Sequence, residues 1–159
     1  MNVTNTQFTT AYLVETTVDT SDADKIKTAV TGGKKINCLL DLGDISLGTR
    51  SVQEYGCMTS DSYFKALGSL TLANITPQLL FDPTDTAGQA DLKDMWTNST
   101  RRKLIILLND EITPTTGNNT SITFETAISN PTIGISKDSA VMYNPTMEIC
   151  SKPDIIEAT

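Results

Sequence analysis

The sequence predicts a mainly β domain, a sandwich or barrel of antiparallel sheets with one flanking α-helix. Threonine, whose β-branched and polar side chain suits the solvated face of a sheet, supplies 26 of the 159 residues. Several short segments alternate apolar and polar residues, as in Ser69–Leu72 and Ile122–Ile128. One segment, Ala87–Asn98, places its apolar residues at helical spacing. The length and the lack of an internal repeat or boundary indicate a single domain over residues 1–159.

The N-terminal third carries the weakest signals. Residues 1–10 are polar with isolated apolar side chains, which predicts an arm that is mobile or becomes ordered with a partner. Ala11–Thr17 predicts a first strand, and Lys25–Val30 fits either a short helix or a strand. Ile36–Leu42 predicts another strand, which Ile45–Leu47 can extend.

Residues 48–67 show no clear periodicity and predict a long irregular connection. A connection of this length inside a compact domain is normally functional or ordered by a partner. The alternative is an unrecognised strand and helix, and the sequence favours neither. If the segment contacts another subunit, the side chains available for that contact are Arg50, Glu54, Tyr55, Asp61, Tyr63, Phe64 and Lys65.

Residues 67–110 predict one β-α-β unit. Leu70 and Leu72 share one face of a strand, Pro77 marks a bend, and a second apolar strand follows at residues 79–81. Leu104–Leu108 lacks alternation, which predicts a strand covered on both faces, by the sheet core and by the preceding helix.

The helix of this unit has clear start and end signals. Thr86 with Gln89 fits a capping box, and the basic residues 101–103 follow the end of the helix. That basic cluster suits either a helix C-terminus or a salt bridge between subunits. The predicted contact between helix and sheet is made by Leu92, Met95, Trp96, Leu104 and Ile106.

The C-terminal third predicts further short strands after a polar turn at residues 110–119. Ile122, Phe124 and Ile128 alternate with polar neighbours, and later apolar pairs continue this pattern to Ile149. Residues 151–159 are expected to form a C-terminal tail.

Composition excludes several classes of function. The net charge of -7 opposes binding of DNA or anionic lipid by bulk attraction. Histidine is absent, so the Ser-His-Asp triad and the commonest transition-metal ligand are both missing. Three widely spaced cysteines (Cys38, Cys57 and Cys150) form no zinc-binding pair and suit a reduced protein. We therefore expect no enzymatic activity and no cofactor. The sequence also predicts no export signal and no membrane span.

Three stretches, which together span residues 48–155, resemble the tail tube proteins of long-tailed bacteriophages. Glu54–Cys57 through Phe64–Ser69 resembles the loop and strand entry of that family. Leu79–Asp85, running into the helix and the Leu104–Leu108 strand, resembles its central element. Met147–Pro153 resembles its closing strand, although Cys150-Ser151 departs from the expected turn.

The resemblance implies a structural virion protein made in the host cytoplasm. Subunits of such families form hexameric rings that stack into a tube, through which DNA passes without specific binding. It also implies contacts with the tape measure, the tail terminator, and the baseplate or tip proteins. The long segment 48–67 and the N-terminal arm are then the expected contacts between rings.

An acidic, threonine-lined wall suits such a conduit, because it repels DNA and prevents sticking. The side chains expected to line the channel are Thr123, Glu125, Thr146 and Glu148. Two alternatives fit the same sequence: a ring or tube protein of a contractile injection or secretion apparatus, and a monomeric phage decoration or receptor-binding β module.

Overall fold

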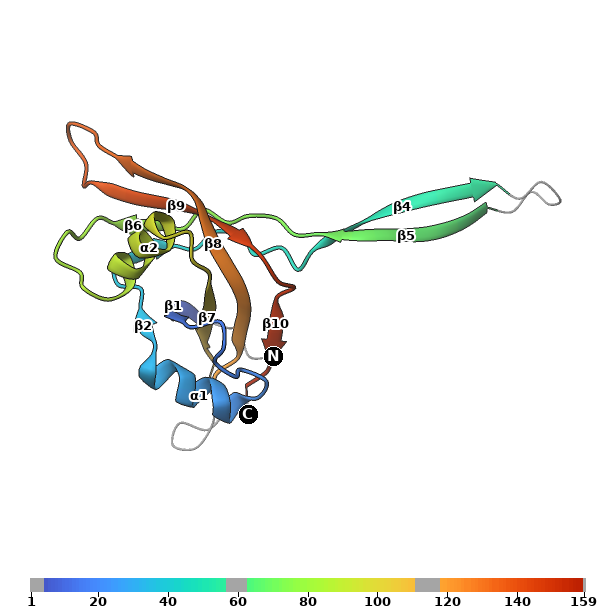
Figure 1. Cartoon of the computed structure of the whole chain (residues 1–159), viewed down its shortest axis with the longest axis horizontal. Helices are drawn as coiled ribbons and strands as arrows, with labels where there is room; N and C mark the ends of the chain where they lie inside the picture. Colours follow the sequence, from blue (N-terminus) through green and yellow to red (C-terminus); the bar gives the residue numbers. More distant parts are fainter. Residues whose placement is uncertain (1–4, 57–62, 111–117, 159) are drawn as a thin grey trace.

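The computed structural model describes residues 5–56, 63–110 and 118–158. Within them the chain forms ten strands and two helices, most of them in one curled sheet (Figure 1). In chain order these are β1 (Asn5–Val14), α1 (Ala23–Gly32), β2 (Lys34–Lys35), β3 (Leu39–Asp41), β4 (Thr49–Gly56), β5 (Tyr63–Thr71), β6 (Gln78–Leu80), α2 (Gly88–Thr97), β7 (Arg102–Asn109), β8 (Ser121–Gly134), β9 (Met142–Ile149) and β10 (Asp154–Ile156).

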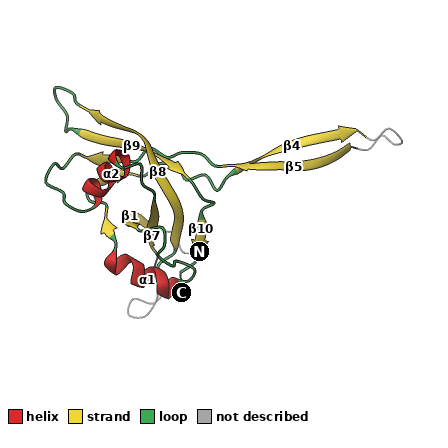
Figure 2. Ribbon diagram, in the orientation of Figure 1, coloured by secondary structure: helices red, strands yellow, loops and turns green. Residues whose placement is uncertain are grey.

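The main sheet is antiparallel throughout, in the order β2-β1-β7-β8-β9-β6-β3, with β10 paired to the first part of β8. The prediction of a mainly antiparallel β fold is confirmed. The segment at residues 25–30, which fitted a helix or a strand, lies in α1, a helix additional to the predicted one. Strands β4 and β5 pair only with each other and project from the body as a separate hairpin (Figure 2).

Strand β7 is buried on both faces, which explains its uninterrupted apolar sequence. Leu104 and Ile106 face the main core, and Ile105 faces a second cluster beneath α1. The two helices therefore cover opposite faces of this strand: α2 packs on the main-core face and α1 on the other. The expectation that the helix preceding β7 would cover the face opposite to the core is wrong, because that face belongs to α1.

The inward and outward alternation of side chains along β8 reverses partway along the strand. The register with β9 shifts between Ile128 and Asn130, which indicates a β-bulge. Before the bulge, Phe124 and Ile128 are buried in the main core. After it, Ile133 pairs with Tyr143, whose side chain points into that core. An extra residue reverses the alternation of a strand, so the odd-numbered residues of β8 take over the core face.

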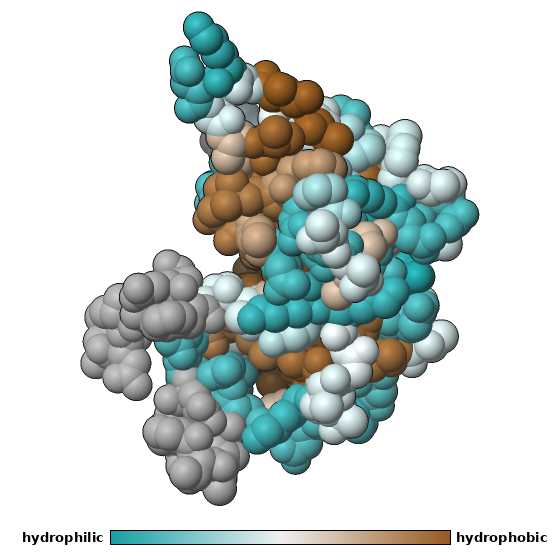
Figure 3. Space-filling view, turned by 90° about the vertical axis from the view of Figure 1, so that its left-hand side faces the viewer, coloured by the Kyte–Doolittle hydropathy of each residue, from teal (hydrophilic) through white to brown (hydrophobic). Residues whose placement is uncertain are grey.

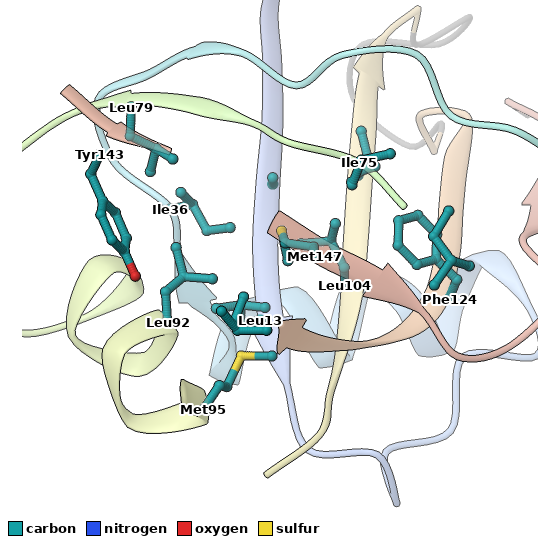
Figure 4. Packing of buried hydrophobic residues seen from close by; sticks show 14 residues of the cluster. Leu13, Ile36, Ile75, Leu79, Leu92, Met95, Leu104, Phe124, Tyr143 and Met147 are labelled. Carbon is teal, nitrogen blue, oxygen red and sulfur yellow. The ribbon is translucent and has the colours of Figure 1, made fainter. Parts of the chain in front are cut away.

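The main core gathers buried side chains from α2 and five strands, together with Ile36 and Ile75 from the connections (Figure 4). The figure shows the Tyr143 hydroxyl pointing toward α2. This hydroxyl has no hydrogen-bond partner among the described residues, and burial raises the pKa of Tyr143. A buried hydroxyl without a partner loses its hydration with no compensation.

We therefore expect Tyr143→Phe to leave the free energy of unfolding unchanged or to raise it by up to about 1 kcal/mol. Urea unfolding followed by circular dichroism measures this difference. A loss of more than about 1 kcal/mol would show that the hydroxyl makes a favourable hydrogen bond.

Helix α2 begins differently from the sequence prediction. The backbone N–H groups of Ala87 and Gln89 donate to the carboxylate of Asp85, at 2.8 and 2.9 Å. The Gln89 side chain points inward, where its amide donates to the Leu80 carbonyl at 2.7 Å and its oxygen accepts from the Asp82 N–H at 3.0 Å. The capping box predicted for Thr86 and Gln89 is therefore wrong, because Asp85 supplies the capping oxygen.

Candidate interaction surfaces

All residues of β4 and most residues of β5 are exposed in the described chain. Tyr55, Tyr63, Phe64 and Leu67 are between 54% and 73% exposed. A two-stranded hairpin is marginally stable alone in water, and exposed aromatic side chains are enriched where proteins meet. The segment 48–67, which showed no periodicity, thus contains most of a regular hairpin rather than an irregular loop or a helix.

Both faces of this hairpin carry apolar side chains. Tyr55 lies opposite Phe64 on one face, and Val52 lies opposite Leu67 on the other. Directly opposed residues share a face, so neither face is purely polar. A hairpin of this kind can be covered on two sides, unlike the outer sheet of a soluble domain, which has one solvated face.

Polar side chains of the hairpin mainly pair within it. Lys65 Nζ lies 3.0 Å from Glu54 Oε1 across the two strands, and an Arg50 Nη1 donates to the Gly68 carbonyl at 3.3 Å. Six of the seven side chains proposed for inter-subunit contact therefore lie together on one projection. The seventh, Asp61, lies outside the described residues.

The four proposed channel-lining residues share one side of the β8–β9 pair. Glu125, Thr146 and Glu148 are half-buried on the face opposite to the main core. Thr123 is 5% exposed, because it lies between Ile105 of β7 and Asp154 of β10 on the side that α1 covers. It offers almost no surface to a channel.

The contact between α2 and the sheet contains four of the five predicted side chains. Leu92, Met95, Leu104 and Ile106 lie in the main core. Trp96 is 49% exposed, so its predicted place in the core is wrong. The face of α2 that is buried against the sheet contains Asp91, Leu92 and Met95, and Trp96 lies outside this face.

Asp91 forms a buried ionic cluster that the sequence did not reveal. Its side chain is 1% exposed and accepts from Lys34 Nζ at 2.7 Å and from Arg102 Nε at 3.2 Å. Arg102 also contacts Glu15 at 3.3 Å and Asp94 at 3.8 Å. Of the basic residues 101–103, Arg102 is therefore paired inside its own subunit. The cluster ties α2 to β2, to β7 and to Glu15, the residue that follows β1.

A groove of about 640 Å³ runs beside this cluster, between α1 and β1. Its apolar lining includes Val14, Val18 and Ala29. At its edge Asp19 pairs with Lys25 at 2.8 Å, and this bond lowers the pKa of Asp19 to about 2. The three cations that line the groove, Lys25, Lys34 and Arg102, are all paired with carboxylates.

The described residues contain no group of three or more potential metal ligands. They also include no helix with the length and apolar character needed to cross a membrane. The distinctive surfaces of the described part of the chain are the projecting hairpin and the polar face of β8 and β9.

No protein-family model matches the chain, and no curated protein matches it in sequence. Solved structures match over nearly the whole length. One is a chain of the anti-feeding prophage baseplate, with a TM-score of 0.70 and 6% identity over 99% of this chain and 97% of that one. A second is the SPP1 tail tube, with a TM-score of 0.62 and 11% identity over 94% and 76% of the two chains.

A third match is a chain of the sheath/tube terminator of an extracellular contractile injection system, called PVC. It has a TM-score of 0.62 and 17% identity over 98% of this chain and 97% of that one. At such identities the likeness concerns the fold. The chain has a tail tube-like fold, which confirms at this level the resemblance found in the sequence.

Proposed function

We propose that this chain is a structural, non-catalytic subunit of a phage tail tube. Six copies form a ring, and rings stack into a tube through which DNA passes into the host cell. The observation that carries the proposal is the β4–β5 hairpin, which exposes apolar side chains on both faces and projects from a body with a tail tube-like fold. Contacts that repeat without closing on themselves produce filaments.

Assembly would take place in the host cytoplasm, and the finished tube would belong to the virion. Its ends would contact other tail proteins: the tape measure inside, the tail terminator above, and the baseplate or tip below. Contacts between subunits of the tube are made by surfaces that are exposed in the single chain. The N-terminal arm contributes to the contacts between stacked rings.

Negative-stain microscopy of the purified protein at rising concentration tests this proposal. We expect six-fold rings or long hollow filaments. A monodisperse monomer at high concentration would overturn the proposal and favour a decoration or receptor-binding module.

A contractile injection apparatus is the second candidate, because one of the matching structures described above, the sheath/tube terminator, comes from such a system. Its tube is surrounded by a sheath, whereas a non-contractile tail has none. Purification of the tube from its native particle, followed by identification of co-purifying proteins, distinguishes the two. A sheath protein present in a constant ratio to this chain favours the injection apparatus or a contractile tail.

The polar face of β8 and β9 is proposed to line the bore. Glu125 and Glu148 would repel the phosphate backbone and keep DNA from adhering. We expect Glu125→Lys with Glu148→Lys to permit tube assembly but to slow DNA ejection, because lysine binds phosphate. Ejection from purified particles, followed by dye fluorescence, measures this rate. Unchanged kinetics would count against the placement of these residues in the bore.

A further inference from the structure

We propose that the β4–β5 hairpin of one copy docks on an apolar overhang at the free end of β8 and β9 in the next copy. The overhang consists of Ile133, Ile135 and Val141. This inference rests on the proposed tube and adds to it the surface that receives the hairpin.

The overhang extends the core face of the sheet beyond the body. Ile133 pairs with Tyr143, which is 2% exposed, yet Ile133 itself is 51% exposed. Ile135 is 80% and Val141 36% exposed. Ile135 and Val141 lie directly beyond the last paired residues, Gly134 of β8 and Met142 of β9, and two positions from Ile133 and Tyr143. Within the described chain, these three exposed apolar side chains thus adjoin the end of the core.

The hairpin and the overhang lie at opposite ends of the molecule. The hairpin projects from one end of the long axis, and the β8–β9 turn lies at the upper corner of the opposite end (Figure 1). Viewed from that second end, an apolar surface lies directly below the polar tip (Figure 3). Two different surfaces at opposite ends of one chain make a head-to-tail contact, which extends into an open array instead of closing as a dimer.

The charges of the chain favour contact between these two ends. Residues 49–71 contain Arg50, Lys65, Glu54 and Asp61, so their charges cancel. Residues 129–146 contain only Lys137 and Asp138, which cancel as well. The whole net charge of -7 therefore resides elsewhere. Copies of an acidic protein repel one another, and its two neutral ends can approach at the lowest electrostatic cost.

The distal half of the hairpin is the part that reaches the neighbour. It carries Tyr55 and Phe64 on one face and Tyr63 on the other. Large aromatic rings against branched aliphatic side chains bury much apolar area with little loss of side-chain entropy. The partner that covers the overhang is therefore a second copy of this chain, which contacts it through the aromatic residues of its hairpin.

Photo-crosslinking tests the contact. In the full-length chain, Phe64 is replaced by p-benzoylphenylalanine, the assembled tubes are irradiated, and the crosslinked peptides are sequenced by mass spectrometry. We expect intermolecular crosslinks to residues 131–142. Tubes with crosslinks elsewhere, or with none between copies, would overturn this inference and leave the tube itself intact. Failure of the wild-type chain to form tubes would instead overturn the proposed function.

A substitution on the receiving side provides an independent test. Ile135→Asp should raise the concentration needed for assembly by roughly tenfold or more, because it removes apolar contact and places a charge in the docking surface. Its high exposure makes a folding defect unexpected, and an unchanged thermal midpoint verifies this. The matched control is Ile155→Asp on β10, where Ile155 is 44% exposed, and it should assemble normally. Equal behaviour of the two variants would contradict the assignment.

Discussion

Tyr55→Ser combined with Phe64→Ser is expected to abolish tube formation while the body of the subunit stays folded. The two rings lie opposite each other on one face of the hairpin and are 54% and 64% exposed. Burial of a large apolar side chain contributes roughly 1.5–3 kcal/mol. Loss of both corresponds to an increase of roughly a hundredfold or more in the concentration required for assembly.

Sedimentation velocity over a concentration series measures this change. The body should be unaffected, because β4 and β5 pair only with each other and contribute no residue to either core cluster. The matched control is Glu54→Ser with Lys65→Ser, which removes a cross-strand ion pair of the same hairpin. An exposed pair of this kind contributes little, so this variant should assemble nearly as well as the wild type. Normal assembly of the aromatic variant would contradict the role of the hairpin.

Arg102→Ala is expected to cost about 3–5 kcal/mol of the free energy of unfolding. The substitution leaves the carboxylate of Asp91, which is 1% exposed, with Lys34 as its remaining ionic partner. A buried charge that loses a partner is not rehydrated. The loss of stability therefore exceeds the net stabilisation that the ion pair itself contributes. The cluster joins α2 to β2 and β7, and its disruption should also loosen the start of β7.

Urea unfolding measures this effect most cleanly in the Tyr55→Ser and Phe64→Ser background. In that background unfolding is not coupled to assembly, which otherwise makes apparent stability depend on concentration. Arg101→Ala is the matched control, because the preceding arginine is exposed and should change stability by less than about 0.5 kcal/mol. A loss below about 1 kcal/mol for Arg102→Ala would show that the cluster is not a structural anchor.

The parts of the fold that could be predicted are those whose signal is local. The α2 segment and β7 were recognised because Leu92 and Met95 follow helical spacing and Leu104–Leu108 is continuously apolar. The hairpin was not recognised, since its side chains do not alternate toward a core of their own. Apolar residues on both faces of a hairpin can be buried only by contact with a partner, which the sequence of one chain does not show.

Other features depend on residues distant in the sequence. The cluster around Asp91 joins Lys34 and Arg102 from separate strands, and neither spacing nor composition reveals it. The bulge after Ile128 reverses the alternation of β8 without a glycine to mark it. Thr123 was expected to be polar surface, yet β7 and β10 enclose it. Strand β10 lies within residues 151–159, which were predicted to form a tail.

Helical reconstruction of the assembled protein from cryo-electron micrographs tests the central claim most directly, namely that copies of this chain complete one another. We expect a hollow tube with six subunits per ring, with each β4–β5 hairpin buried against a neighbouring copy and Glu148 facing the bore. A filament without a bore, or hairpins that extend freely into solvent, would contradict this claim.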